Sequence, residues 1–219
     1  MPGNILQPKN LWHFYSIEKN ENYHANYQKH PLQNIEPYEN WRYLYTAEED
    51  QLSPFYGREY SEFEFTKAVY NYYIHPQWDE FGSTTLYIKV LMADYASKYV
   101  IIEMIGEWND AIENDIMTFK RDVIDIMIKD GISKFILIAE SVLNFHSSDS
   151  SYYEEWFEDV TDENGWIVCL NMPEQTQYDF KRARLHHYIE LMSFPQWRTL
   201  KPDVVFMQID NILLRRLDL

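Results

Sequence analysis

The 219-residue chain carries 35 acidic and 19 basic side chains, which gives a formal net charge of −16 and a pI near 4.7. Binding to nucleic acids and to anionic membrane surfaces relies on Lys and Arg, so this balance argues against both kinds of partner. No stretch approaches the roughly 18 apolar residues of a membrane span, and the first residues lack the apolar core of a secretion signal. We therefore expect a cytoplasmic protein.

Residues 1–57 differ from the rest of the chain. They combine five prolines with closely spaced tyrosines and tryptophans, and neither a helical nor a strand period persists. Disordered segments are poor in aromatic residues, so free disorder is not expected here. We interpret residues 1–57 as an extended, aromatic-rich arm. It would pack rings against the α/β domain predicted for residues 58–219, or against a neighbouring subunit.

From residue 58 onward the sequence predicts a regular α/β domain. Apolar residues alternate over 62–75, and apolar runs at 84–94 and 99–108 are separated by short turns. Strands this close in sequence pair antiparallel. The remaining strands are predicted at 134–140, 165–172 and 203–209, and the helices at 110–131, 149–160 and 174–192. The fold class is therefore α/β with a mixed sheet, in which an N-terminal antiparallel hairpin is followed by β-α-β-α-β-α-β.

One stretch of this domain has a family resemblance. FILIAESVLNFHSSDSSYYEEW (135–156) places Asp149-Ser150-Ser151 between a strand and a helix. Together with the element order, it resembles the STAS domain, named for sulfate transporters and anti-sigma-factor antagonists, over residues 84–215, about 60% of the chain. In that family an Asp-Ser-Ser/Thr-Gly motif opens the helix. The resemblance implies a regulatory protein with a phosphorylatable serine at Ser150 or Ser151, although Tyr152 replaces the glycine.

The same loop is the strongest candidate site from the residues alone. It follows an apolar strand and precedes a helix, and ligands of open α/β sheets bind at such strand ends. A phosphate there would add nearly two negative charges beside several acids and release a partner by repulsion. A plain capping loop with solvated hydroxyls remains the alternative. The candidate regulatory or binding residues are His146, Ser147, Ser148, Asp149, Ser150 and Ser151.

Other candidates have weaker support. The basic cluster Lys181, Arg182 and Arg184 is either a solvated helix face or a site for an anion or for the acids of a second copy. In the predicted 75–83 loop, Trp78 and Phe81 either cover a core edge or contact a partner.

Three glutamates, Glu103, Glu107 and Glu140, lie in or beside apolar strands. Each is either a water-facing residue or a buried acid with a raised pKa. Cys169 lies in an apolar run and is interpreted as a packing residue.

No spacing typical of metal ligands and no nucleotide or catalytic motif is present, so we expect no metal site and no cofactor. The leading hypothesis is a non-enzymatic, acidic regulatory module that binds a protein partner or forms a homodimer. The second hypothesis is an enzyme or small-ligand-binding protein with a pocket near His146–Ser151. The third is a structural subunit of a larger assembly.

Overall fold

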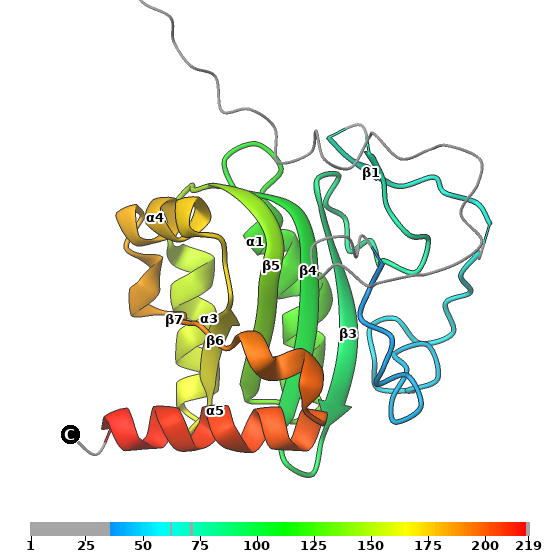
Figure 1. The fold of residues 1–219 in the computed structure, drawn as a ribbon. Helices are drawn as coiled ribbons and strands as arrows, with labels where there is room; N and C mark the ends of the chain where they lie inside the picture. Colours follow the sequence, from blue (N-terminus) through cyan, green and yellow to red (C-terminus); the bar gives the residue numbers. More distant parts are fainter. Residues whose placement is uncertain (1–35, 62, 71, 218–219) are drawn as a thin grey trace, which may run out of the picture. The chain divides into compact units, whose positions relative to one another are not determined.

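The domain is built on one five-stranded mixed sheet. The computed structural model describes residues 36–61, 63–70 and 72–217 (Figure 1), so the predicted path of the arm over 1–35 lies outside the described residues. The strands are ordered β3 (Leu86–Asp94), β4 (Tyr99–Asn109), β5 (Lys134–His146), β6 (Trp166–Leu170) and β7 (Glu190–Met192). β3 and β4 form an antiparallel hairpin, and β4 to β7 are parallel. The predicted fold class is confirmed.

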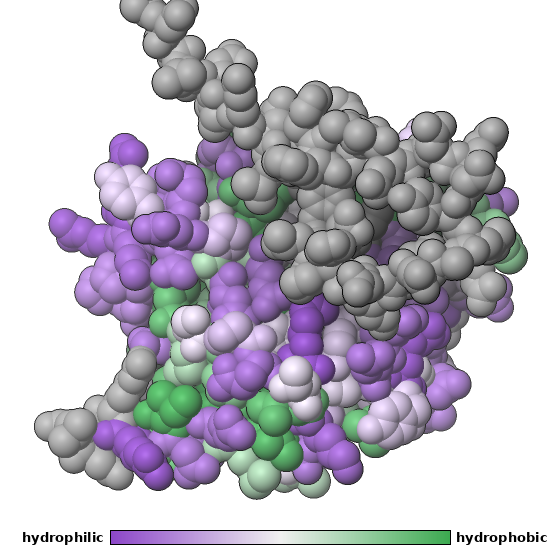
Figure 2. All heavy atoms as spheres, viewed as in Figure 1, coloured by the Kyte–Doolittle hydropathy of each residue, from purple (hydrophilic) through white to green (hydrophobic). Residues whose placement is uncertain are grey.

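Helices cover both faces of the sheet. One face packs against α1 (Asp115–Phe119), the π-helical η2 (Lys120–Ile124), α2 (Asp125–Lys129), α3 (Ser151–Thr161) and α4 (Glu174–Arg182). The other face packs against the 3-10 helix η4 (Pro195–Thr199) and α5 (Pro202–Leu217), which crosses the strands in Figure 1. Hydrophilic side chains cover the outer surface over α4 (Figure 2). None of the described helices is long and apolar enough to cross a membrane.

The strand predicted at 203–209 is wrong, because these residues form the first half of α5. Pro202 opens the helix, and the buried residues Val205, Ile209 and Leu213 recur every four positions. Such spacing is helical, and burial of each side chain contributes roughly 1.5–3 kcal/mol. The valines within 203–209 have the β-branched side chains typical of strands. The helical spacing of apolar residues can be recognised only when Leu213 is included.

The last strand of the sheet is instead β7, which lies within the helix predicted at 174–192. That helix ends at Arg182, and Arg184 adopts a left-handed conformation with φ of 64°. A non-glycine residue in this region interrupts helical geometry. The chain then forms the short 3-10 helix η3 (Leu185–His187) and enters β7.

The strand predicted over 62–75 is largely wrong. Among the described residues of this stretch, only β1 (Ala68–Val69) and β2 (Tyr72–Tyr73) form, as a separate two-stranded ladder. Phe63 is 86% exposed, so the alternating aromatic residues do not point into a core.

Residues 36–57 form turns that contribute apolar side chains to the core. Trp41 and Phe55 are 3% and 2% exposed, and the Trp41 indole N–H donates to the Leu200 carbonyl over 3.0 Å. These contacts hold the turns on the same compact unit as the sheet. The predicted division at residue 57 stays a prediction.

Gly106 in β4 provides a test of the hairpin. It has a φ of +121°, and a Cβ there would lie 2.1 Å from the Thr85 carbonyl oxygen. We expect Gly106→Ala to lower the free energy of unfolding by at least about 3 kcal/mol, because strain and a backbone clash combine. Gly131→Ala is the control, because its φ is +95° but nothing lies within 4 Å, so only about 1 kcal/mol is expected. Urea unfolding measures both, and equal losses would contradict the interpretation.

Candidate functional site at the carboxyl edge of the sheet

The loop at 146–151 is anchored where β5 ends. β5 runs six residues beyond the predicted strand, and beyond Ile138 it pairs only with β4. The carbonyl of His146 accepts hydrogen bonds from the backbone N–H groups of Asp110 (2.9 Å) and Ala111 (3.2 Å). This contact joins the β5–α3 loop to the β4–α1 turn, so the two loops form one edge surface.

Within the loop, polar side chains are paired locally. His146 Nε2 lies 2.7 Å from Glu107 Oε1 on the neighbouring strand. Asp149 accepts hydrogen bonds from the backbone N–H of Ser151 (2.9 Å) and from its hydroxyl. These two hydrogen bonds lower the pKa of Asp149. His146 and Asp149 thus have different partners, and their contacts do not form a Ser-His-Asp relay.

The remaining loop residues are open to solvent. Ser147 and Ser148 are exposed, and Ser150 is half-buried at the N-cap of α3. The Ser150 hydroxyl has no hydrogen bond among the described residues, whereas the Ser151 hydroxyl is held by Asp149. Ile112, in the adjoining turn, is 81% exposed. The structure thus brings the predicted loop together with a neighbouring exposed apolar residue.

A buried polar network lies directly beneath this edge. Asp110 accepts hydrogen bonds from Tyr153 (2.6 Å), from the Trp108 indole (3.0 Å) and from the Ile116 backbone N–H (2.9 Å). Burial raises the pKa of Asp110 from 3.8 to about 7, although the three hydrogen bonds act in the opposite direction. Asp110 lies outside α1, and through its bond to the N–H of Ile116 it satisfies a backbone donor in the first turn of that helix.

A second acid completes the network. Asp115 accepts a hydrogen bond from the Asn109 backbone N–H over 2.7 Å, and burial raises its pKa to about 6. The two carboxyl groups fix the 109–114 turn from below. They were not singled out as site residues from the sequence, because only the fold shows that they are buried.

A different carboxylate pair lies on the α5 face of the sheet. Arg198 lies 3.1 Å from Glu103 and 3.0 Å from Glu140, on adjacent strands. Burial raises the pKa of Glu103 to about 7, even though Arg198 and the Tyr38 backbone N–H act to lower it. Of the two readings left open for Glu103, the structure supports the buried acid. Glu140 also accepts from the Trp197 indole over 2.7 Å.

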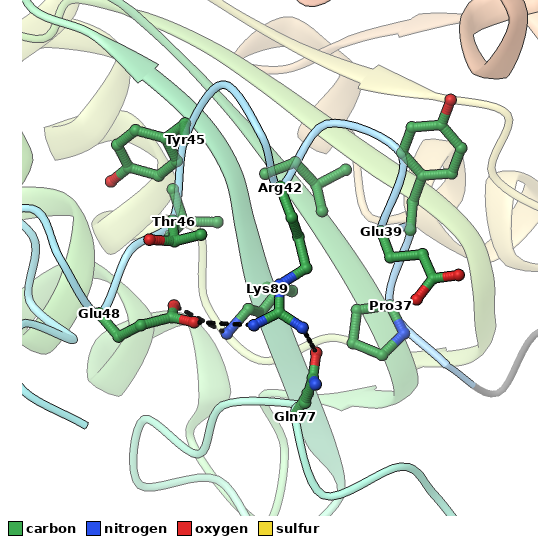
Figure 3. Close-up of a pocket in the computed structure, with 11 residues that line it drawn as sticks. Pro37, Glu39, Arg42, Tyr45, Thr46, Glu48, Gln77 and Lys89 are labelled. Atoms are coloured by element: carbon green, nitrogen blue, oxygen red, sulfur yellow. Dashed lines mark hydrogen bonds and ion pairs between the residues drawn. The ribbon is translucent and has the colours of Figure 1, made fainter. Parts of the chain in front are cut away.

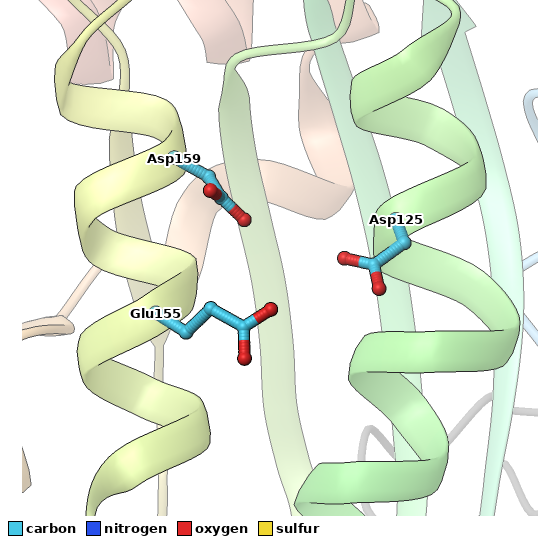
Figure 4. A group of neighbouring side chains, drawn as sticks. All are labelled: Asp125, Glu155 and Asp159. Atoms are coloured by element: carbon cyan, nitrogen blue, oxygen red, sulfur yellow. The ribbon is translucent and has the colours of Figure 1, made fainter.

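Three acids on α2 and α3 have oxygens within 4.8 Å of one another (Figure 4). The fully buried Lys120 ammonium lies among them. It contacts Asp125 and lies 2.8 Å from Asp159 and 3.4 Å from Glu155. Burial lowers the pKa of Lys120, but its acidic partners more than reverse this effect, so the ammonium is held in its charged form. An internal cation therefore takes the position that a metal ion would need.

Hollows occur beside residues 37–58 in the described part of the chain. The first has a volume of about 20 Å³ and lies between the 37–48 turns and β3 (Figure 3). That volume suits a single water molecule, and Arg42 closes it by bonding Gln77 (3.0 Å) and Glu48 (3.4 Å). The second is an open hollow of about 520 Å³ lined in part by Phe81 and Asp122. Neither is lined by a residue of the 146–151 loop.

The other predicted contact residues lie apart from the edge. Trp78 is 1% exposed and packs with Tyr87 and Ile105, and Phe81 is 5% exposed and lies in the main core. Burial within the chain agrees with the alternative that these two side chains cover a core edge, and a role as partner contacts stays a prediction. Lys181, Arg182 and Arg184 are exposed on α4 and on the turn that follows it.

Comparisons with known proteins give a likeness of fold. No protein-family model and no curated protein matches the chain. The unphosphorylated anti-sigma factor antagonist SpoIIAA is 12% identical over 57% of this chain and 96% of its own, with a TM-score of 0.43. The phosphorylated Bacillus cell fate determinant SpoIIAA covers 56% and 98% at 12% identity, with a TM-score of 0.39. TM1081 from Thermotoga maritima is 15% identical over 50% and 87%, with a TM-score of 0.37.

The raised pKa of Asp110 predicts a pH dependence of stability. The unfolded carboxyl group loses its proton near pH 4, whereas the folded one holds it until about pH 7. The folded state therefore binds the extra proton in this window, and stability decreases as pH rises through it, by up to about 1.4 kcal/mol per pH unit. We expect Asp110→Asn to flatten this slope in urea unfolding measured from pH 4 to 8. Exposed Asp162→Asn is the control, and an unchanged slope in Asp110→Asn would refute the assignment.

The position of Lys120 predicts a latent cation site. In Lys120→Met the three carboxylates lose their buried cation, while Arg121 still pairs with Asp125 and Glu155 at the surface. We therefore expect a lower melting temperature that Mg²⁺ or Ca²⁺ partly restores. The same ions should leave the melting temperature of the wild-type protein unchanged. Lys129→Met, which changes an exposed lysine at the end of the adjoining α2, is the control. Equal responses of all three proteins would show that Lys120 does not fill the site.

Proposed function

We propose that this chain is a non-enzymatic regulatory module that binds a protein partner through its carboxyl-edge surface, defined as residues 111–113 and 146–151. The observation that carries the proposal is that this surface is both exposed and fixed. The His146 carbonyl holds the two loops together, and the buried Asp110 network supports them from below. A partner that binds preformed loops avoids the entropic cost of ordering them.

Added charge at Ser150 or Ser151 would act as the switch. A phosphate carries nearly two negative charges at neutral pH. At Ser151 it would displace the hydroxyl from Asp149 and lie beside that carboxylate. At Ser150 it would add charge to a hydroxyl that makes no bond of its own among the described residues. In both cases nearby Glu154 increases the repulsion, which favours release of a partner that binds the neutral loop.

The geometry gives less support to the other two hypotheses. A pocket at the strand ends would need His146 and Asp149 to converge on a cavity, and each is instead paired within the surface. A structural subunit would have no need of exposed serines on a fixed surface, so that hypothesis does not account for them. The regulatory module is therefore the function that the described residues favour.

The test compares serine variants in affinity capture from the native cell lysate, with quantitative mass spectrometry. We expect the wild-type chain and Ser150→Ala/Ser151→Ala to retain a common partner. Ser150→Asp/Ser151→Asp should lose it, by at least about tenfold, because like charges are placed in the contact.

Ser97→Asp is the matched control. Its hydroxyl also bonds a nearby aspartate, Asp94 (3.0 Å), but it lies in the β3–β4 turn at the opposite end of the sheet. The control should keep the partner. Identical retained proteins for all four chains, or equal losses in Ser97→Asp and the loop variant, would rule out a switch at this edge.

A further inference from the structure

A second surface, which adjoins the carboxyl edge at the start of α3, carries charged side chains of both signs without partners among the described residues. Its basic half comprises the exposed side chains of Lys181, Arg182, Arg184, His186 and His187. No ion pair to an acidic group is found for these five among the described residues, although the chain as a whole is strongly acidic. Within this group the two imidazole rings of His186 and His187 pack against each other, with centroids 4.4 Å apart.

The acidic half lies on the outward face of α3. Glu154 and Glu158 are one helical turn apart, so they project from the same side, and both are exposed. The neighbouring acids of α3, Glu155 and Asp159, face α2 and are occupied by Lys120. For Glu154 and Glu158 no side-chain partner is found in the described part of the chain.

An aromatic contact joins the two halves. Phe157 of α3, 37% exposed, meets Tyr188, which directly follows the basic segment, edge to face with ring centroids 6.0 Å apart. The surface therefore has an acidic side, a partly apolar centre and a basic side, all on adjacent elements. In Figure 1, α3 and α4 lie next to each other at the same side of the sheet.

We propose that this surface, made by α3 and by residues 181–188, is a homodimer interface, and that its occupant is a second copy of this chain. A twofold axis through the Phe157–Tyr188 contact would place the basic half of each copy against the acidic half of the other. Interfaces of twofold dimers use the same patch on both subunits, so the patch must be complementary to itself. Adjacent halves of opposite charge meet this requirement. A nucleic acid fits poorly, because Glu154 and Glu158 would repel its phosphates.

Two charge-reversal variants test the proposal in the full chain. Arg182→Glu/Arg184→Glu makes both halves acidic, and Glu154→Lys/Glu158→Lys makes both basic. Each variant alone should dimerise at least about tenfold more weakly than the wild type, because like charges then face each other twice. When the two variants are mixed, both contacts of the mixed dimer become attractive again. We expect its dissociation constant to return to within about threefold of the wild-type value.

Sedimentation equilibrium is the measurement, at about 0.15 M salt, where the Debye length of about 8 Å screens the repulsion between two acidic chains. Lys201→Glu/Arg215→Glu is the control, because it changes the net charge as much as the arginine variant does but lies at α5. This control should dimerise like the wild type, and circular dichroism checks that all variants fold.

Three results would overturn the proposal. The first is a wild-type chain that stays monomeric up to about 100 µM, which would leave the basic half to an acidic partner of another sequence. The second is a single variant that dimerises like the wild type. The third is a mixture of the two variants that fails to associate.

Discussion

The ion pairs of Arg198 with Glu103 and Glu140 are the interaction on which the α5 face of the sheet depends. This face is covered partly by α5 and partly by irregular segments, which bring backbone polar groups against apolar strands. Arg198, from η4, bridges two adjacent strands. The carboxylates also accept the Tyr38 N–H and the Trp197 indole, so one network holds two irregular segments on the sheet. Buried charges persist only when they are paired and hydrogen-bonded in this way.

The sequence predicted the sheet well because its strands are buried on both faces and therefore read as continuous apolar runs. The same property caused the error in α5. Val204, Val205 and Phe206 look like a strand when they are read alone, and only burial of every fourth residue identifies a helix. The true edge strand, β7, has three residues and carries almost no signal. Its place is set by Arg184, whose left-handed backbone ends α4 and returns the chain to the sheet.

The location of the candidate site could be predicted from the sequence, but the residues that hold its loop in place could not. A polar loop between a parallel strand and a helix lies at the carboxyl edge in any such fold, so residues 146–151 were found without coordinates. The groups that fix this loop come from elsewhere. Glu107 and Asp110 approach it only because β4 and β5 pair up to Asn109 and His146. Tyr153 reaches Asp110 from α3, across 43 residues of sequence. Such contacts depend on the register in which the strands pair, and a local sequence pattern does not predict that register.

The distribution of charge connects these observations. The chain has a net charge of −16, yet each buried cation is paired with more than one acid. Lys120 is paired in this way, and Lys89 pairs with both Asp79 and Glu48. Cations used in this way leave the remaining acids on the surface, which keeps an aromatic-rich chain soluble. Against that background, basic side chains without an acidic partner among the described residues stand out at 181–187. Glu154 and Glu158 of the neighbouring α3 are likewise exposed. A surface that meets its own copy requires such charges of both signs.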